Sequence, residues 1–385
     1  MKCCLYIFSL LMLTLGYCEN TETIVPPPSL PTPKVTPKLL PNTQGYAIKE
    51  NQIAKGFNQS ARILTNYNIF LSSSFIYWQA SEGGLDLGHF IVEEQNENNI
   101  KEVINMNFKY KPGFKVALGT ALNHDNWILS AEYTWLQCSN QTTIPADSFP
   151  SDEFLVEGWY YNSLTFELYA HWKLNYDMID VLMQKPLYLG THLIVTPFAS
   201  IRGGLIKQYY IYKAGNIYFE RLVDIGWDII ESTQNTWVVG PRGGMSTDWI
   251  FFKDFRIVSN LAASLCYQHF NNYSSVGTKI FNDSSKLVLT EDRVLRVLFN
   301  QLTPTIDGAL GIAWGSYFGK NSWHFDLSLL YEIHYFWNQN KMRALNQKIV
   351  QELLVNDALG YVYSPSYASE DLMLQGLTLT VRFDF

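Results

Sequence analysis

The residues best suited to chemistry in this chain are acidic, basic and histidine side chains that alternate with apolar ones. Within residues 323–337, His324, Asp326, Glu332 and His334 all lie an even number of positions apart, which places them on one face of a β-strand. Imidazole and carboxylate groups are common metal ligands. However, a strand rises about 3.3 Å per residue, so His324 and Glu332 lie roughly 26 Å apart. The two pairs cannot share one ion, and the sequence predicts neither a metal site nor a cofactor here.

Charged side chains of both signs also recur on the polar faces of other alternating stretches. In a closed sheet these faces would line the interior. The charges would then either form compensating ion pairs or line a constriction whose field sets ion preference. The assignment rests on alternation alone, and one β-bulge would invert it. The predicted inward-facing residues are Glu132, Glu167, Lys173, Arg202, Arg242, Asp307, Asp326 and Glu332.

The elements that must position these charges are long β-strands. Residues 163–176, "SLTFELYAHWKLNY", alternate strictly, with Leu168, Trp172 and Tyr176 on the apolar face, which a helical period does not explain. Similar stretches cover much of the chain after residue 61, roughly a dozen in all. An even number of antiparallel strands suits a closed barrel. We therefore expect an all-β antiparallel barrel of about 12–16 strands over residues 61–385.

The aromatic residues indicate where the apolar faces point. A soluble sandwich would bury these faces between two sheets, usually with short strands, whereas a membrane barrel turns them to lipid. Aromatic side chains lie towards the strand ends, and aliphatic ones fill the middles, as in the two aromatic girdles of a membrane barrel. Lipid offers backbone amides no partner, so such a sheet must close on itself. The predicted girdle residues are Trp127, Trp135, Trp172, Trp323 and Trp337.

Enzyme and nucleic-acid signatures are not found in the sequence. It contains no G-x-S-x-G, HExxH or CxxC pattern, and we identify no Ser–His pair on a lipid-facing rim that could act as a lipase. The glycines of residues 240–244, "GPRGG", predict close backbone approach in a strand, not a phosphate loop. A formal charge of −7 without a basic run argues against nucleic-acid binding. We expect a protein that is not an enzyme.

The N-terminal residues predict export. An apolar run with small residues before Glu19 indicates a signal peptide over residues 1–18, with a lipoprotein cut before Cys18 as the alternative. Residues 19–60 read as a proline-rich periplasmic linker. Cleavage after Cys18 leaves Cys138 and Cys266 in the mature chain, too few for a disulfide framework. The sequence leaves open whether these two form disulfides within or between chains.

The C-terminus, "LTLTVRFDF", alternates up to its last residue. It resembles the C-terminal signal by which the assembly machinery of the outer membrane recognises barrels, with Phe383 and Phe385 as the signal residues, although Thr380 stands where glycine is common. A strand that closes a barrel also needs its hydrogen-bond ladder intact to the end. We expect this segment to serve both recognition and closure.

Several segments together resemble a known family. Residues 112–137, 195–210, 236–249, 302–318, 324–342 and 374–385 are similar in order to the Legionella-type major outer membrane proteins, whose relatives are the major porins of Chlamydia-like bacteria. The resemblance implies a bacterial outer-membrane porin, a water-filled channel for passive diffusion of ions and small hydrophilic solutes. A surface adhesin or structural antigen with a narrow or blocked lumen is the alternative. The expected partners are outer-membrane lipid and the barrel-assembly machinery, with a homo-oligomer left open. The few cysteines of the mature chain depart from the chlamydial pattern.

Overall fold

The computed structural model describes the barrel part of the chain. All described residues belong to the unit formed by residues 51–385. The predicted signal peptide and proline-rich linker lie outside them, so both remain predictions. The described residues are 69–94, 97–122, 127–145, 153–157, 159, 164–189, 192–218, 224–252, 254–281, 287–318, 323–346 and 369–385.

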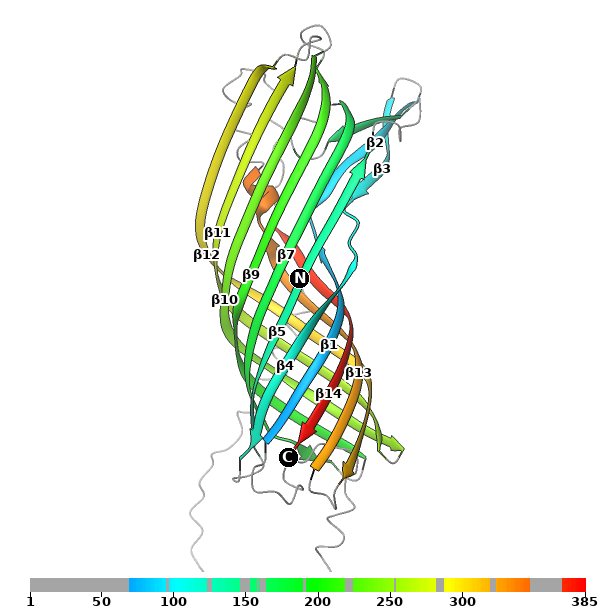
Figure 1. Ribbon diagram of the computed structural model, residues 1–385, viewed down its shortest axis with the longest axis vertical. Coiled ribbons are helices and arrows are strands. Elements are labelled where there is room, and N and C mark those ends of the chain that lie inside the picture. The colour runs from blue at the N-terminus through cyan, green and yellow to red at the C-terminus, as the bar shows by residue number, and fades with distance from the viewer. Residues whose placement is uncertain are drawn as a thin grey trace, which may run out of the picture. The chain divides into compact units, whose positions relative to one another are not determined.

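Ten long strands form a closed antiparallel ring (Figure 1). Pairing of β1 with β14 and of β7 with β9 closes the sheet, and every neighbouring pair is antiparallel. This confirms the all-β antiparallel barrel. The strands of the ring are β1 (Ile69–Glu82), β4 (Tyr110–Ala121), β5 (Ile128–Ile144), β7 (Leu164–Gln184), β9 (Leu193–Tyr218), β10 (Asp224–Phe252), β11 (Phe255–Phe281), β12 (Leu287–Phe318), β13 (Trp323–Asn340) and β14 (Glu370–Asp384).

The expected count of 12–16 barrel strands was wrong, because the strands are longer than the sequence pattern suggested. Strands β9 to β12 run for 26, 29, 27 and 32 residues, so the chain forms fewer and longer strands than the alternating stretches of the sequence indicated. The remaining strands lie outside the ring. Strands β2 (Asp86–Glu94), β3 (Glu97–Asn105) and β6 (Glu153–Glu157) extend the sheet beside β7, and β8 (Leu187–Tyr188) pairs with β9.

The two ends of the barrel differ in their connections. Strand β1 begins and β14 ends at the same end, where the Phe385 amide donates to the Ile69 carbonyl at 2.9 Å. The connections at that end are short, whereas the segment 83–109 and the connection from β13 to β14 lie at the other. Outer-membrane barrels have short periplasmic turns and long extracellular loops. The end that carries Phe385 is therefore the periplasmic one, and the upper part of Figure 1 is extracellular.

The outer face carries an apolar band around the periplasmic half of the barrel. On β10, Trp237 and Trp249 are 42% and 55% exposed and enclose Val239 and Met245, which are also exposed. At about 3.3 Å per residue and a tilt of about 40°, the twelve steps between the two tryptophans climb roughly 30 Å, close to the apolar thickness of an outer membrane. Exposed leucine, isoleucine and valine side chains continue this band around the ring. The side chains on this band face lipid.

Strand β7 shows how the facing pattern changes at the membrane boundary. Ile179 and Val181 point outward and are about half exposed, as lipid-facing residues should be, whereas Leu168 and Trp172 are completely buried inside the barrel. Beyond the membrane the outer face meets water, so apolar side chains turn inward as in a soluble protein. The prediction that Leu168, Trp172 and Tyr176 face lipid was therefore wrong.

Three predicted site residues on β7 lie in this part of the strand, where apolar side chains face inward and polar ones face outward. Trp172 does not belong to an aromatic girdle, because it is buried inside the barrel. Lys173 is exposed on the outer face and does not line the lumen, and Glu167 is half-buried beside the buried Leu168, outside the interior cavity described below.

The extracellular half of the barrel is filled by a hydrophobic core. Trp78, Trp172, Tyr176, Tyr210 and Phe336 are fully or almost fully buried in one cluster. A short helical turn over residues 342–346 adds the buried Met342. No helix among the described residues is both long and apolar enough to cross a bilayer. The barrel therefore has a packed extracellular half and a membrane-spanning half with a different interior.

The glycine-rich stretch of β10 confirms the predicted close approach of backbones. A Cβ atom added to Gly240 would lie 2.3 Å from the carbonyl oxygen of Leu265 on the neighbouring strand. Any side chain at this position would collide with backbone, so only glycine fits.

Candidate functional site

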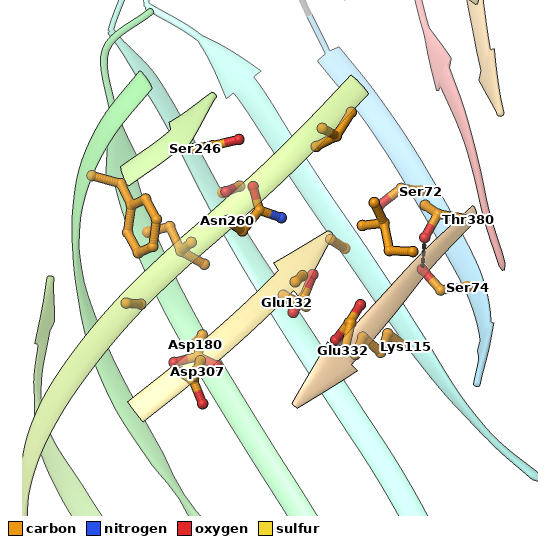
Figure 2. A pocket seen from close by; sticks show the side chains of 18 of the residues that line it. Ser72, Ser74, Lys115, Glu132, Asp180, Ser246, Asn260, Asp307, Glu332 and Thr380 are labelled. Carbon is orange, nitrogen blue, oxygen red and sulfur yellow. Dashed lines mark hydrogen bonds and ion pairs between the residues drawn. The ribbon is translucent and has the colours of Figure 1, made fainter. Parts of the chain in front are cut away.

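A polar cavity occupies the membrane-spanning half of the barrel. Its volume is about 320 Å³, and residues from all ten strands of the ring line it. It extends from Gln184 and Pro186 near the periplasmic rim to Trp78 and Tyr176 at the base of the hydrophobic core. Figure 2 shows side chains from several strands converging on it, with Lys115 beside Glu332 and Asp180 beside Asp307.

An ion pair spans this cavity. Arg202 on β9 places Nε 2.9 Å from Oδ1 of Asp180 on the adjacent β7, and its Nη1 lies 3.0 Å from Oδ2 of Asp307 on β12. Arg242 on β10 also reaches Asp307, with Nε 2.8 Å from Oδ2. Asp307 therefore pairs with two guanidinium groups, and Arg202 joins strands that are not neighbours in the ring.

The network continues from Asp307 through a histidine to the far side of the ring. His334 Nδ1 lies 2.7 Å from Asp307 Oδ1, and its Nε2 lies 3.1 Å from Glu332 Oε2. Glu332 also accepts from Lys115 Nζ on β4 at 2.5 Å. Acidic and basic groups alternate along this chain of contacts, so each buried charge has a partner of opposite sign.

A second group of ion pairs lies nearer the periplasmic rim. Arg256 on β11 sits between Asp248 on β10 and Asp326 on β13, with N–O distances of 2.8 and 2.6 Å. Arg382 and Asp384, two residues apart on β14, pair at 3.1 Å. The two groups together fill much of the cross-section with matched charges.

Aromatic side chains cover the charged network on its extracellular side. The Lys115 ammonium lies 4.7 Å from the centre of the Trp78 ring, and the same ring lies 4.7 Å from that of His334. Tyr176 and Phe336 meet edge to face at 6.0 Å across the barrel. On this side of the interior, the path from the cavity outward is blocked by rings.

The wall formed by β10, β11 and β12 carries polar side chains through the same region, among buried apolar ones such as Val238 and Phe270. Buried polar atoms of four side chains along it, and of Gln339 on the adjacent β13, have no hydrogen-bond partner among the described residues. Buried polar groups nearly always pair with protein or water. This polar wall begins beside Arg242 and continues towards the extracellular end, where Gln234 and Asn272 pair at 3.2 Å. The side chains with unpaired atoms are Thr236, Gln268, Asn272, Thr303 and Gln339.

The predicted site residues fall into two sets. Six of the eight expected lumen residues line the cavity, and Glu167 and Lys173 do not. Trp323 and Trp337 are exposed on the outer face, Trp127 and Trp135 are half-buried, and Trp172 is inside. The six that line the cavity are Glu132, Arg202, Arg242, Asp307, Asp326 and Glu332.

Other residues of the site were missed in the sequence. Asp180, Asp248 and Arg256 are buried in the network, but each stands in a long strand whose inward face also carries apolar residues, so the polar pattern is broken. His334 was considered as a metal ligand and instead bridges two carboxylates. Among the described residues, no group of three or more His, Cys, Asp and Glu side chains could hold a metal ion.

One Ser–His pair was also missed. Ser139 Oγ lies 2.9 Å from His171 Nε2 on the exposed outer face of β5 and β7. No described acidic or amide oxygen accepts a hydrogen bond from the other ring nitrogen of His171, so the third member of a catalytic triad is not seen in this part of the chain.

The ring of strands, the apolar band and the charged interior define a β-barrel of the bacterial outer membrane. The chain belongs to the family of the Legionella pneumophila major outer membrane protein precursor, whose model matches residues 65–385. This confirms the resemblance seen in the sequence and the expected location in the outer membrane. A search of curated proteins gives no match.

Comparison with solved structures gives matches of low identity. The Escherichia coli outer membrane protease OmpT is 10% identical with a TM-score of 0.40, and the match covers 83% of this chain and 96% of OmpT. A Pseudomonas aeruginosa FadL homologue is 7% identical with a TM-score of 0.23, covering 86% and 93%. The Pseudomonas putida toluene transporter TodX is 9% identical with a TM-score of 0.22, covering 83% and 89%.

Proposed function

We propose that this protein is a narrow porin, a pore that lets small ions diffuse across the outer membrane and excludes larger solutes. The observation that carries the proposal is the polar wall of β10, β11 and β12, with its four side chains whose buried polar atoms have no partner among the described residues. Such atoms take up water where space allows. Water along this wall would connect the charged cavity to the extracellular end.

The narrowness follows from the packing of the rest of the interior. Ten strands enclose little more than their own side chains, and here Arg202, Asp307, Lys115 and Glu332 bridge the cavity. An ion moving along the polar wall would pass these charges at close range. The charges of both signs would make passage sensitive to small rearrangements of the network. The pore proposed here is therefore narrower than the open water-filled channel expected for a barrel of 12–16 strands.

A closed barrel with a structural or adhesive role is the second candidate. The packing of Trp78, Tyr176 and Phe336 above the cavity favours it, because these rings leave no space on their side of the barrel. Enzymatic activity is not part of either proposal, since membership of a major outer membrane protein family suggests a non-enzymatic role. The two candidates differ in one measurable property, the conduction of ions.

Reconstitution separates the candidates. The purified, heat-modifiable protein is inserted into planar bilayers in potassium chloride and, in parallel, into liposomes for swelling assays with sugars of increasing size. A narrow pore gives discrete conductance steps in the bilayer and no swelling with disaccharides. If the folded protein gave no conductance steps, the narrow porin would be ruled out and the structural or adhesive role would be the remaining candidate. Rapid swelling with trisaccharides would contradict the restricted lumen.

A further inference from the structure

Two lysines lie on the outer face just beyond the extracellular edge of the apolar band. Trp135 on β5 and Trp237 on β10 mark this edge, and Asp177 on β7 and Leu205 on β9 continue it between them through cross-strand pairing. Lys207 is two residues beyond Leu205, and Lys173 is four residues beyond Asp177. Each step along a tilted strand climbs about 2.5 Å, so the Cα atoms of Lys207 and Lys173 lie roughly 5 and 10 Å above those of Leu205 and Asp177, at the height of lipid headgroups.

The two lysines are neighbours on one exposed surface. Lys173 pairs across the strands with Tyr209, and Lys207 pairs with Asn175, so the lysines occupy diagonal positions about 7–8 Å apart at Cα. Both are exposed. Neither forms an ion pair with any residue that the structure describes. A cationic surface without internal partners is available to an external anion.

Among the described residues, the surroundings of the lysines are mostly polar and carry no acidic residue at the same height. The nearest acids are Asp177, whose Oδ1 accepts from Tyr133 Oη at 2.8 Å, and Glu231, which lies further from the membrane opposite Ile211. The chain as a whole carries a net charge of −7, so a patch without acids stands out from the average surface. The two outward rows above the edge, excluding the lysines, consist of Gln137, Asn175, Asn235, Asn271 and Leu298, then Ser139, Tyr209, Thr233, Tyr273 and Arg296.

We propose that Lys173 and Lys207 bind the phosphate groups of a phosphorylated glycolipid in the outer leaflet. The apolar band below, with Ile179 and Leu205 exposed, would contact the acyl chains. The lysines would pair with phosphate, and the amides of Asn175 and Asn235 could donate hydrogen bonds to phosphate or sugar oxygens. The height, charge and polar neighbours match a lipid whose headgroup is both anionic and rich in hydroxyl groups.

The test measures retention of lipid by the folded full chain in detergent, using native mass spectrometry. The probes are lipid A with both phosphates, the same lipid after enzymatic dephosphorylation, and phosphatidylglycerol. Each lysine near an anionic surface contributes about a fivefold change in binding, so Lys173→Gln with Lys207→Gln should weaken binding of phosphorylated lipid A by about 30-fold. Lys279→Gln, an exposed lysine further along the extracellular part of β11, should leave it unchanged.

Several results would overturn the proposal. These are equal retention of the dephosphorylated lipid, equal retention of phosphatidylglycerol, displacement by millimolar inorganic phosphate, or an unchanged affinity in the double variant. Lys173→Arg with Lys207→Arg should retain binding, because it keeps both charges. If the glutamine variant failed to fold, as judged by heat modifiability, the comparison of lipids on the unaltered protein and the arginine variant would still decide the question.

Discussion

Arg202 and Asp307 lie on strands separated in the ring by β10 and β11, yet their side chains meet inside the barrel with Nη1 3.0 Å from Oδ2. Both side chains are almost completely buried. A buried guanidinium without its carboxylate is strongly destabilising, whereas the intact pair is close to neutral. The contact therefore ties two non-adjacent strands of the barrel together and helps to fix the shape of the cavity.

Replacing Asp307 by Asn should destabilise the barrel. The charge of Asp307 compensates Arg202 and Arg242, so its loss leaves buried cations without a full partner, at a cost of about 3–5 kcal/mol. Urea unfolding in detergent micelles or liposomes measures this directly. Asp292→Asn, at an exposed position on the same strand, is the matched control and should change the unfolding free energy by less than about 0.5 kcal/mol. Equal unfolding midpoints for the two variants would show that the network contributes nothing.

The position of the membrane can be tested with one substitution at two heights of β9. Ile201 is 65% exposed within the apolar band, and Ile211 points to the same side of the strand beyond the band. Ile201→Lys should cost about 2–4 kcal/mol, because it places a charge in lipid. Ile211→Lys should cost less than about 0.5 kcal/mol, since its outer surroundings are aqueous. The yield of heat-modifiable protein in the outer membrane is the measurement, and similar losses at both positions would contradict the boundary.

Tryptophan fluorescence can separate lipid-facing rings from interior ones. Trp249 is 55% exposed at the periplasmic edge of the band, and Trp172 is fully buried inside the barrel. Brominated lipids quench only rings that approach the acyl chains, so Trp249→Phe should reduce the quenched part of the emission. Trp172→Phe should reduce total emission and leave the quenched part unchanged. If Trp172→Phe reduced the quenched part of the emission, Trp172 would have to face the acyl chains, which would contradict its placement inside the barrel.

The last residue offers a test of assembly. The Phe385 amide continues the closing ladder by donating to Ile69, and its ring is exposed at the periplasmic end. Deleting Phe385 should reduce the amount of barrel in the outer membrane severalfold, because both a ladder bond and the predicted recognition residue are lost. Phe318→Ala, at an exposed aromatic near the same rim, is the control and should assemble close to normally. If the chain lacking Phe385 assembled at full yield, Phe385 would not be part of the assembly signal.

Much of the fold could be predicted from the sequence where apolar residues face outward and polar residues face inward along a whole strand. On β13, Leu329 and Ile333 face lipid while Glu332 and His334 are buried inside, and the alternation assigned each correctly. This worked because the membrane-spanning part of the strand has apolar residues outside and polar ones inside, which is the rule for a membrane barrel.

Strand β7 could not be read in the same way. It crosses the membrane boundary near Asp177, and the solvent outside the barrel changes there from lipid to water. Leu174 and Ile179 are both apolar, yet the first faces the interior core and the second faces lipid. Alternation gives the period of a strand but not which solvent lies on each side. The cross-barrel contacts of Arg202 were equally hidden, since they depend on the number of strands and their register.

The measurement that tests the central claim most directly is the single-channel conductance of a variant on the polar wall. Gln268 is completely buried on β11 with neither amide atom paired among the described residues. Gln268→Leu removes a polar site of about 1.4 kcal/mol from the proposed path, so the conductance should fall by about tenfold. Gln137→Leu, at an exposed position on the outer face of β5, should conduct like the unaltered protein. Unchanged conductance in Gln268→Leu would contradict an ion path along β10, β11 and β12.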